Sequence, residues 1–336
     1  MVFVTGGTGL LGSHLLVELV QQHDQITAIY RNKSKIDTVK KCFDFYLKEN
    51  AELHFNKITW KECDVLDTPS LEEELQGHKI VYHCAAIVSF AKRDFQHMME
   101  INRYGTENIV NLSLDLGVEK FCFVSSTAAV GTKDIPSNVE VDENGKWILT
   151  EETSGYSVTK YSAEKEVWRG INEGLNAVIV NPSIIFGAGD WEESSMKIFK
   201  TISKGMKFYS PGANAFVDAR DVARIMIELM NRNTFNNRYL CIGENAKFQH
   251  LFELVAKELD IKPPSKKVNP ILMGITWRLS VAWAALTFSK PLITKSAAHN
   301  AFKTTKYSSQ KIKDAIGYQF YTLEETVENA VKGRIR

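Results

Sequence analysis

The feature that most constrains the fold of this chain is a glycine-rich stretch close to its N-terminus. Residues 5–12 read TGGTGLLG and follow directly on the apolar stretch MVFVT. Gly7, Gly9 and Gly12 have the G-x-G-x-x-G spacing, and Gly6 adds a further permissive position. Glycines here allow a tight turn from strand to helix and let backbone N–H groups approach a pyrophosphate at the helix N-terminus. We therefore predict a dinucleotide-binding turn made by Thr5, Gly6, Gly7, Gly9, Leu10, Leu11 and Gly12.

Short apolar stretches alternate with helical patterns through the first half of the chain. The predicted strands are residues 1–5, 25–30, 56–65, 78–86, 120–126 and 176–182. The predicted helices between them are residues 10–22, 34–49, 69–75, 94–116 and 157–173. Strands separated by helices form βαβ units, whose right-handed crossovers place ligands at the carboxyl ends of the strands. The sequence therefore predicts an α/β fold with a Rossmann-type doubly wound parallel sheet.

The alternation changes after Pro182, where a loop rich in glycine and aspartate leads to a helix near residues 193–204. Residues 216–230 have the pattern of a short strand followed by a helix, and residues 238–243 that of one more strand. We expect both strands to return to the parallel sheet. From Glu244 onward the pattern is helical and irregular. The predicted organisation is a Rossmann domain of residues 1–181 and 216–243, with a smaller, mostly helical substrate-binding lobe of residues 182–215 and 244–336.

The overall composition gives no support for several classes of partner. The 41 basic and 40 acidic residues give a formal net charge of +1, which offers no electrostatic reason to expect nucleic acid or an anionic membrane. The five cysteines form no C-x-x-C pair, which is typical of reduced thiols in a cytosolic protein. The eight histidines show no H-E-x-x-H pattern, so no metal site is predicted. No secretory leader precedes the first predicted strand, so we expect a cytoplasmic protein.

The end of the second predicted strand indicates which dinucleotide binds. An acidic residue there would accept hydrogen bonds from the adenosine ribose and favour NAD. Arg31 instead suits a 2′-phosphate, with Lys33 or Lys35 nearby, although these cations would also fit as solvated charges at a helix start. We therefore predict NADP(H) in preference to NAD(H). Asp64 and Val65 are expected at the adenine edge, with a simple helix cap as the alternative.

Tyr156 and Lys160 form a Y-x-x-x-K pattern, which places both side chains on one helix face. An unperturbed tyrosine has a pKa of about 10 and is a poor base at neutral pH. We expect the Lys160 ammonium to lower that pKa and to hold the nicotinamide ribose, so that Tyr156 exchanges a proton with a carbonyl or an alcohol. Ser126 ends the fifth predicted strand, where its hydroxyl can bind the same substrate oxygen. The alternative to this catalytic role is that Ser126 is only a turn residue and Tyr156 lies on the surface of its helix.

Together these motifs resemble the extended short-chain dehydrogenase/reductase family. The matching segments occur in the family's order and are TGGTGLLG (5–12), CDV (63–65), HCAAIVSF (83–90), NRYGTENIV (102–110), FVSSTAAVG (123–131), YSVTK (156–160), NPSIIFG (181–187) and FVDARDVA (216–223). The resemblance covers residues 1–223 and is loose in the C-terminal third. It implies an NAD(P)-dependent oxidoreductase, in which a bound nicotinamide carries a hydride.

The resemblance also implies roles for individual residues. Ser126 falls on the family's catalytic Ser/Thr, with Thr127 as the nearby alternative. Asn102 matches an asparagine that supports the active-site helix, although a surface amide would fit the pattern as well. By analogy, a homodimer would form through the helices at 94–116 and 157–173. Ala85 and Ala86 match the family segment that passes the cofactor. Pro182, Ser183 and Ile184 match the segment that contacts the cofactor's carboxamide.

Two branches of this family compete. Its nucleotide-sugar epimerases and dehydratases often carry an arginine seven residues before the aspartate that corresponds to Asp221, where this chain has Asn214. The branch that resembles dihydroflavonol 4-reductase and 3β-hydroxysteroid dehydrogenase often has, in its reductases, an arginine like Arg31. We therefore predict a mostly apolar carbonyl or secondary-alcohol substrate. A nucleotide-sugar enzyme is the alternative, and a non-catalytic NADP(H) sensor ranks third because Tyr156 and Lys160 are both present.

The C-terminal lobe contains a long apolar stretch. Arg278 divides residues 268–289 into uncharged runs of 10 and 11 residues, short of the roughly 20 that span a bilayer, so no integral membrane segment is predicted. The stretch would equally bury a helix against the Rossmann domain. A weaker alternative is that it rests on a membrane surface, which Arg278 and Lys290 would tolerate. Ligand pockets are commonly lined by apolar side chains. The candidates here are Met273, Trp277, Trp283, Leu286 and Phe288.

Overall fold

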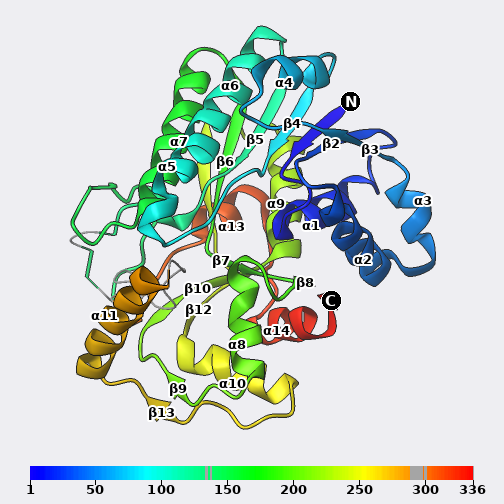
Figure 1. Cartoon of the computed structure of the whole chain (residues 1–336). Helices are drawn as coiled ribbons and strands as arrows, with labels where there is room; N and C mark the ends of the chain where they lie inside the picture. The colour runs from blue at the N-terminus through cyan, green and yellow to red at the C-terminus, as the bar shows by residue number, and fades with distance from the viewer. Residues whose placement is uncertain (133–134, 137, 288–297, 299–300, 336) are drawn as a thin grey trace.

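The structure is a computed structural model that describes residues 1–132, 135–136, 138–287, 298 and 301–335. Its main element is a parallel sheet (Figure 1) of seven strands, β1 (Val2–Thr5), β2 (Ile26–Tyr30), β3 (Ile58–Glu62), β4 (Ile80–His83), β5 (Lys120–Val124), β6 (Ala177–Pro182) and β11 (Asn237–Cys241). Their order is β11-β6-β5-β4-β1-β2-β3. The chain thus runs outward from β1 in both directions, which puts the switch point between β1 and β4. The predicted Rossmann-type sheet is confirmed.

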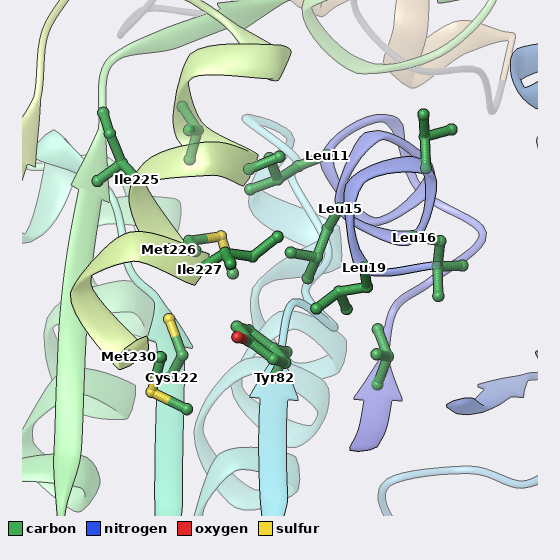
Figure 2. Packing of buried hydrophobic residues seen from close by; sticks show 14 of the residues in the cluster. Leu11, Leu15, Leu16, Leu19, Tyr82, Cys122, Ile225, Met226, Ile227 and Met230 are labelled. Carbon is green, nitrogen blue, oxygen red and sulfur yellow. The ribbon is translucent and has the colours of Figure 1, made fainter. Parts of the chain in front are cut away.

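Alternate residues of each strand face opposite helical layers. Val2 and Val4 of β1 pack toward one layer and Phe3 toward the other, as the period of two along a strand requires. One layer contains α1 (Leu10–Leu19), α2 (Ile36–Leu47) and α9 (Ala219–Asn231). The other contains α4 (Thr68–Leu75), α6 (Gly105–Asp115) and α7 (Gly155–Asn172). Figure 2 shows Leu15 and Leu19 of α1 and Met226 of α9 above Tyr82 of β4, with Met230 beside Cys122 of β5.

The predicted helix over 94–116 is divided into three parts. It begins as α5 (Phe95–Met98), continues as the π-helical segment η4 (Met99–Tyr104), and ends as α6. π-Helical turns occur frequently at functional sites, because they re-aim side chains from one helix face. The link between β2 and β3 also contains the short helix α3 (Ala51–Phe55), which the sequence analysis did not predict.

A second lobe is built around a small three-stranded sheet of β7 (Ile184–Phe186), β10 (Ala213–Asp218) and β12 (Glu244–Lys247). Two short pairs join β8 (Gly189–Asp190) to β14 (Arg334–Ile335) and β9 (Phe208–Tyr209) to β13 (Lys266–Lys267). Its helices are α8 (Lys197–Ser203), α10 (Phe248–Glu258), α11 (Pro270–Leu286) and α14 (Leu323–Lys332), whereas α13 (Gln310–Ile316) packs against β11 of the parallel sheet. Among the described residues no helix is long and apolar enough to cross a membrane.

One predicted strand lies in a different sheet from the one expected. The sequence analysis assigned the strands of 216–230 and 238–243 to the parallel sheet. The second does form its edge strand β11, which pairs with β6. The first is β10, which pairs with β7 and β12 and leaves the main sheet, so this prediction is wrong. The reason is that β11 already occupies the free edge of β6, and a strand's periodicity does not specify its partner.

Candidate active site

The glycine-rich turn lies between β1 and α1 and is too crowded for side chains at two positions. Gly6 has a φ of +68°, and a Cβ there would lie 2.5 Å from the backbone nitrogen of Ala85. A Cβ at Gly12 would lie 2.1 Å from the carbonyl oxygen of Gly6. At Gly9, by contrast, a Cβ would meet only that same oxygen within the described chain, at 3.4 Å. The space before the first turn of α1 therefore stays open, which fits a pyrophosphate at this helix N-terminus.

A buried hydrogen-bond chain fixes the ends of β1 and β4 beside this turn. The Thr5 hydroxyl lies 2.6 Å from Nδ1 of His83 and accepts from the backbone N–H of Ala85. Nε2 of His83 lies 2.9 Å from the Thr106 hydroxyl. Burial lowers the pKa of His83 to about 3, so the ring is neutral at physiological pH. Ala85 is thereby held close to Gly6, whereas the neighbouring Ala86 is exposed.

Only some of the residues predicted to bind the adenosine end of the cofactor lie close together. The Arg31 guanidinium is about half exposed and lies 3.6 Å from the carboxylate of Asp64. Val65, next in the chain, is buried against Gly105. Lys35 instead forms an ion pair of 2.7 Å with Glu193 of the second lobe. Arg31 is therefore the better placed of these two cations to meet a phosphate near Asp64.

Ser126, Tyr156 and Lys160 lie together where β5 ends and α7 begins. The Ser126 hydroxyl lies close enough to Tyr156 to lower its pKa, and it accepts a hydrogen bond from the backbone N–H of Ala128. The Lys160 ammonium is 2% exposed and donates to the carbonyl oxygen of Val124 at 2.7 Å. The hydroxyl of Thr127, the alternative to Ser126, interacts with Tyr307 instead. The two motifs that are 30 residues apart in sequence therefore converge on one site.

The pKa of Tyr156 is shifted in the direction opposite to the one expected. The Y-x-x-x-K spacing predicts that Lys160 lowers this pKa. Burial instead raises the pKa of Tyr156 to about 12, against a smaller lowering by the nearby Ser126 hydroxyl. The physical reason is that the phenolate would lose hydration, while the ammonium is directed to Val124. Burial also lowers the pKa of Lys160 to about 8. In this state Tyr156 is a neutral proton donor beside a lysine that titrates near neutrality.

A buried carboxylate that the sequence analysis missed supports this site. Glu164 lies one further turn along α7, is 2% exposed, and raises the pKa of Lys160 by its charge. It accepts hydrogen bonds from Ser125 at 2.6 Å and from Asn181 at 2.8 Å, and pairs with Arg238 at 3.0 Å. The i, i+4, i+8 series of Tyr156, Lys160 and Glu164 was the available signal.

Asn102 ties the active-site helix to the loop after β4. Its amide exchanges hydrogen bonds with the backbone of Ile87 at 2.7 and 2.9 Å and donates to the Thr159 hydroxyl at 3.0 Å. The residue is 1% exposed, so the surface-amide alternative is wrong. Its position in the π-helical segment η4 aims the amide at Thr159, which lies next to Lys160.

The predicted carboxamide-contacting segment runs from the end of β6 into β7. Pro182 and Ser183 are buried, and Ile184 is half-buried. The Ser183 hydroxyl is buried without a hydrogen-bond partner among the described residues, as is Oδ1 of Asn181. Such groups are normally satisfied, so each has the capacity to bind a polar ligand group. The open turn, Lys160 and these atoms together fit a bound nicotinamide dinucleotide.

The approach to Tyr156 is apolar. The ring of Phe90, from the loop after β4, stands edge-on to Tyr156 with 6.1 Å between centroids. Phe90 is 50% exposed, and its neighbours Val88 and Phe95 are also exposed. Trp283, which was expected to line a pocket, is 67% exposed on α11, so that prediction is not supported for this residue. Phe288 and Lys290 lie outside the described residues.

Comparisons with known proteins agree with this geometry. A family model for the NAD dependent epimerase/dehydratase family matches residues 2–243. The chain is 28% identical over 274 residues to sterol demethylase protein B of Methylococcus capsulatus, covering 80% of this chain and 78% of that protein. It is 24% identical over 338 residues to dihydroflavonol 4-reductase of Arabidopsis thaliana, covering 96% and 79%. The crystal structure of gox2253 superposes with a TM-score of 0.80 at 27% identity, covering 99% of this chain and 97% of that one.

Proposed function

Because the chain belongs to the NAD-dependent epimerase/dehydratase family and is an NAD(P)-dependent enzyme, we propose that it reduces the carbonyl of a mostly apolar small molecule. The observation that carries the proposal is the convergence of Ser126, Tyr156 and Lys160 beside the glycine-rich turn. The reductive direction is proposed because Tyr156, whose pKa burial raises to about 12, carries its proton at physiological pH and can donate it.

In this proposal each residue of the site has a defined task, and Lys160 has two. A nicotinamide dinucleotide, when bound, would supply the hydride that the carbonyl carbon accepts. Tyr156 Oη donates its proton to the carbonyl oxygen, and the Ser126 hydroxyl donates a hydrogen bond that holds that oxygen in place. Lys160 provides positive charge beside the phenolate that forms, and holds the cofactor ribose. Glu164 keeps Lys160 protonated by its negative charge.

We further propose that one part of the chain binds the cofactor and the other binds the substrate. The Rossmann part, with the parallel sheet and its helices, would hold the cofactor through the turn at 5–12, Arg31, Asp64, Val65, Ala85 and Ala86. The second lobe would hold the substrate, with Pro182, Ser183 and Ile184 at the boundary between the two. Strand β10 then belongs to the substrate lobe and not to the cofactor domain.

The proposed substrate class is supported by two features of the chain. Asn214 of β10 is uncharged, and its side chain accepts a hydrogen bond from its neighbour Ala215, so it offers no cation to a diphosphate. The Phe90 ring faces Tyr156 and provides an apolar surface beside the hydroxyl that we propose as proton donor. Pockets for apolar ligands have such walls and few polar groups.

Calorimetry on the cofactor-loaded enzyme tests this substrate class. We expect an aromatic or alicyclic carbonyl compound to bind and to be turned over, and UDP-glucose and dTDP-glucose to give no binding heat. Phe90→Ala should weaken binding of the carbonyl compound, whereas Phe55→Ala, at a site far from Tyr156, should not. Micromolar binding of a nucleotide sugar, with no turnover of any apolar carbonyl, would reverse the assignment in favour of an epimerase or dehydratase.

We propose NADPH as the preferred cofactor, because the guanidinium of Arg31 is exposed at the predicted ribose end. Arg31→Glu should lower NADPH affinity by roughly 10–100-fold and raise the preference for NADH, since a charged hydrogen bond is worth about 1.5–3 kcal/mol. Fluorescence titration with both cofactors measures the change. Lys40→Glu, an exposed charge reversal on α2, is the control and should change neither affinity. Equal affinity of the wild-type enzyme for NADH and NADPH would refute the premise.

A further inference from the structure

Helix α11 (Pro270–Leu286) is apolar on the side that faces solvent. Ile271, Ile275, Leu279 and Trp283 follow one another at intervals of four residues, and their exposed fractions are 75%, 52%, 64% and 67%. Residues four apart stand in a row along a helix, so these side chains form one continuous apolar stripe. A surface helix of a water-exposed protein normally places polar residues on this side.

The opposite side of α11 is also apolar and already has a packing role. Met273 and Trp277 are half-buried, and Ala284 is 6% exposed. Figure 1 shows α11 (orange) at the edge of the second lobe, away from the helical layers of the parallel sheet. The helix therefore needs only one of its two apolar sides to attach to the protein, and the outer stripe is available to a partner.

The charge around α11 is of one sign. Residues 261–313 contain ten lysines and arginines and no aspartate or glutamate, although the whole chain is nearly neutral. Lys262, Lys266 and Lys267 are exposed directly before the helix. Lys266 pairs through β13 with Phe208 of β9, which is itself 45% exposed. The apolar stripe is thus bordered by cations that no acidic residue of this segment offsets.

We propose that the outer stripe of α11 docks onto the surface of an anionic phospholipid bilayer. A helix that lies in the interface places its exposed apolar side chains among the acyl chains, and neighbouring cations interact with the headgroups. Trp283 fits the interface, where tryptophan is enriched. Arg278 stacks on Trp277 at 4.7 Å and donates to the carbonyl of Gly274, so its charged end lies beside the helix and can reach the headgroups.

A bilayer fits this surface better than a second copy of the chain. An isologous contact through α11 would bring the same cations from both partners together without an acidic residue from this segment between them. A spanning helix is excluded for α11, which has 17 residues and Arg278 at its centre. The chemistry required of the partner is an apolar layer beneath a negatively charged surface.

Co-sedimentation with lipid vesicles tests the apolar part of the proposal. We expect the full-length enzyme to bind vesicles of phosphatidylcholine mixed with phosphatidylglycerol, and to bind vesicles of phosphatidylcholine alone at least about tenfold more weakly. Leu279→Glu should weaken binding to the anionic vesicles about tenfold or more, because it places a carboxylate in the stripe. Leu53→Glu on α3 is the matched control, since Leu53 is 67% exposed but far from α11, and should leave binding unchanged.

A second pair of variants tests the charged part. The double variant Lys266→Glu/Lys267→Glu should weaken binding to anionic vesicles about tenfold, and added salt should weaken wild-type binding because it screens exposed charges. The double variant Lys40→Glu/Lys41→Glu, on α2, carries the same change of charge and should bind like the wild type. The tryptophan emission should shift to the blue on binding, and Trp283→Phe should remove most of that shift.

Three results would overturn the proposal. The first is a wild-type enzyme that does not sediment with anionic vesicles. The second is equal binding by Leu279→Glu and Leu53→Glu when thermal denaturation shows both variants folded. The third is a wild-type dimer, measured by light scattering, that Leu279→Glu converts to a monomer, because the stripe would then belong to an interface between two copies. None of these readouts depends on the reaction at Tyr156, so they leave the proposed function unaffected.

Discussion

Tyr156→Phe is expected to lower kcat by roughly 10²–10⁴-fold, the range typical for removal of a general acid or base. The substitution removes only the hydroxyl that we propose as proton donor and keeps the ring that meets Phe90. Cofactor affinity should change little, because Lys160 and the glycine-rich turn are untouched. Steady-state turnover, followed by cofactor absorbance, measures the loss, and a cofactor titration measures the affinity.

Tyr161→Phe is the matched control for that variant. Tyr161 lies on the same helix, but its ring stacks on Trp147 at 4.1 Å and phenylalanine preserves that contact. We expect wild-type turnover from it. Wild-type turnover from Tyr156→Phe on the same substrate would rule out the proposed proton transfer.

Lys160→Ala is expected to reduce kcat/KM by about 10²-fold or more and also to weaken cofactor binding, since one ammonium is assigned to both tasks. The side chain is buried, so the variant also leaves the Val124 carbonyl without its donor. Lys165→Ala, an exposed lysine on the same helix, is the control and should behave as wild type. Loss of turnover with unchanged cofactor affinity would contradict the dual role.

The pH dependence of the wild-type enzyme gives a second readout for Lys160. Its pKa is lowered to about 8, so the ammonium is present below that pH and is lost as the pH rises through it. The rate of reduction should therefore fall as the pH rises through about 8. Tyr156 does not cause this fall, because its pKa of about 12 keeps it protonated throughout that range. A rate that rises through pH 8 would contradict the assignment.

The local motifs of this chain could be predicted from sequence, because each depends on neighbours in the chain. Gly12 is required by contacts within the turn itself, and Gly6 by the positive φ of +68° that the turn gives it. Tyr156 and Lys160 share a helix face through their spacing alone. The parallel sheet followed from the alternation of strands and helices.

What could not be predicted depends on contacts between distant segments. Glu164 meets Arg238, which lies 74 residues further along the chain, and nothing local signals that pairing. The choice of β7 and β12 as partners of β10 has the same origin. The pKa of Tyr156 was expected to fall because a cation lies one turn away, yet burial of the phenol outweighs that neighbour. Burial of Asn102 likewise depends on the fold of η4 against α7.

Transfer of deuterium from a reduced nicotinamide labelled at its hydride position tests the central claim most directly. The enzyme is incubated with labelled NADPH and the apolar carbonyl compound selected by calorimetry, and the product is examined by mass spectrometry and NMR. We predict one deuterium on the carbinol carbon of the product, with one cofactor oxidised for each product formed, and almost none from Tyr156→Phe. Conversion of a nucleotide sugar with no net oxidation of the cofactor, and no deuterium in any apolar alcohol, would contradict the account.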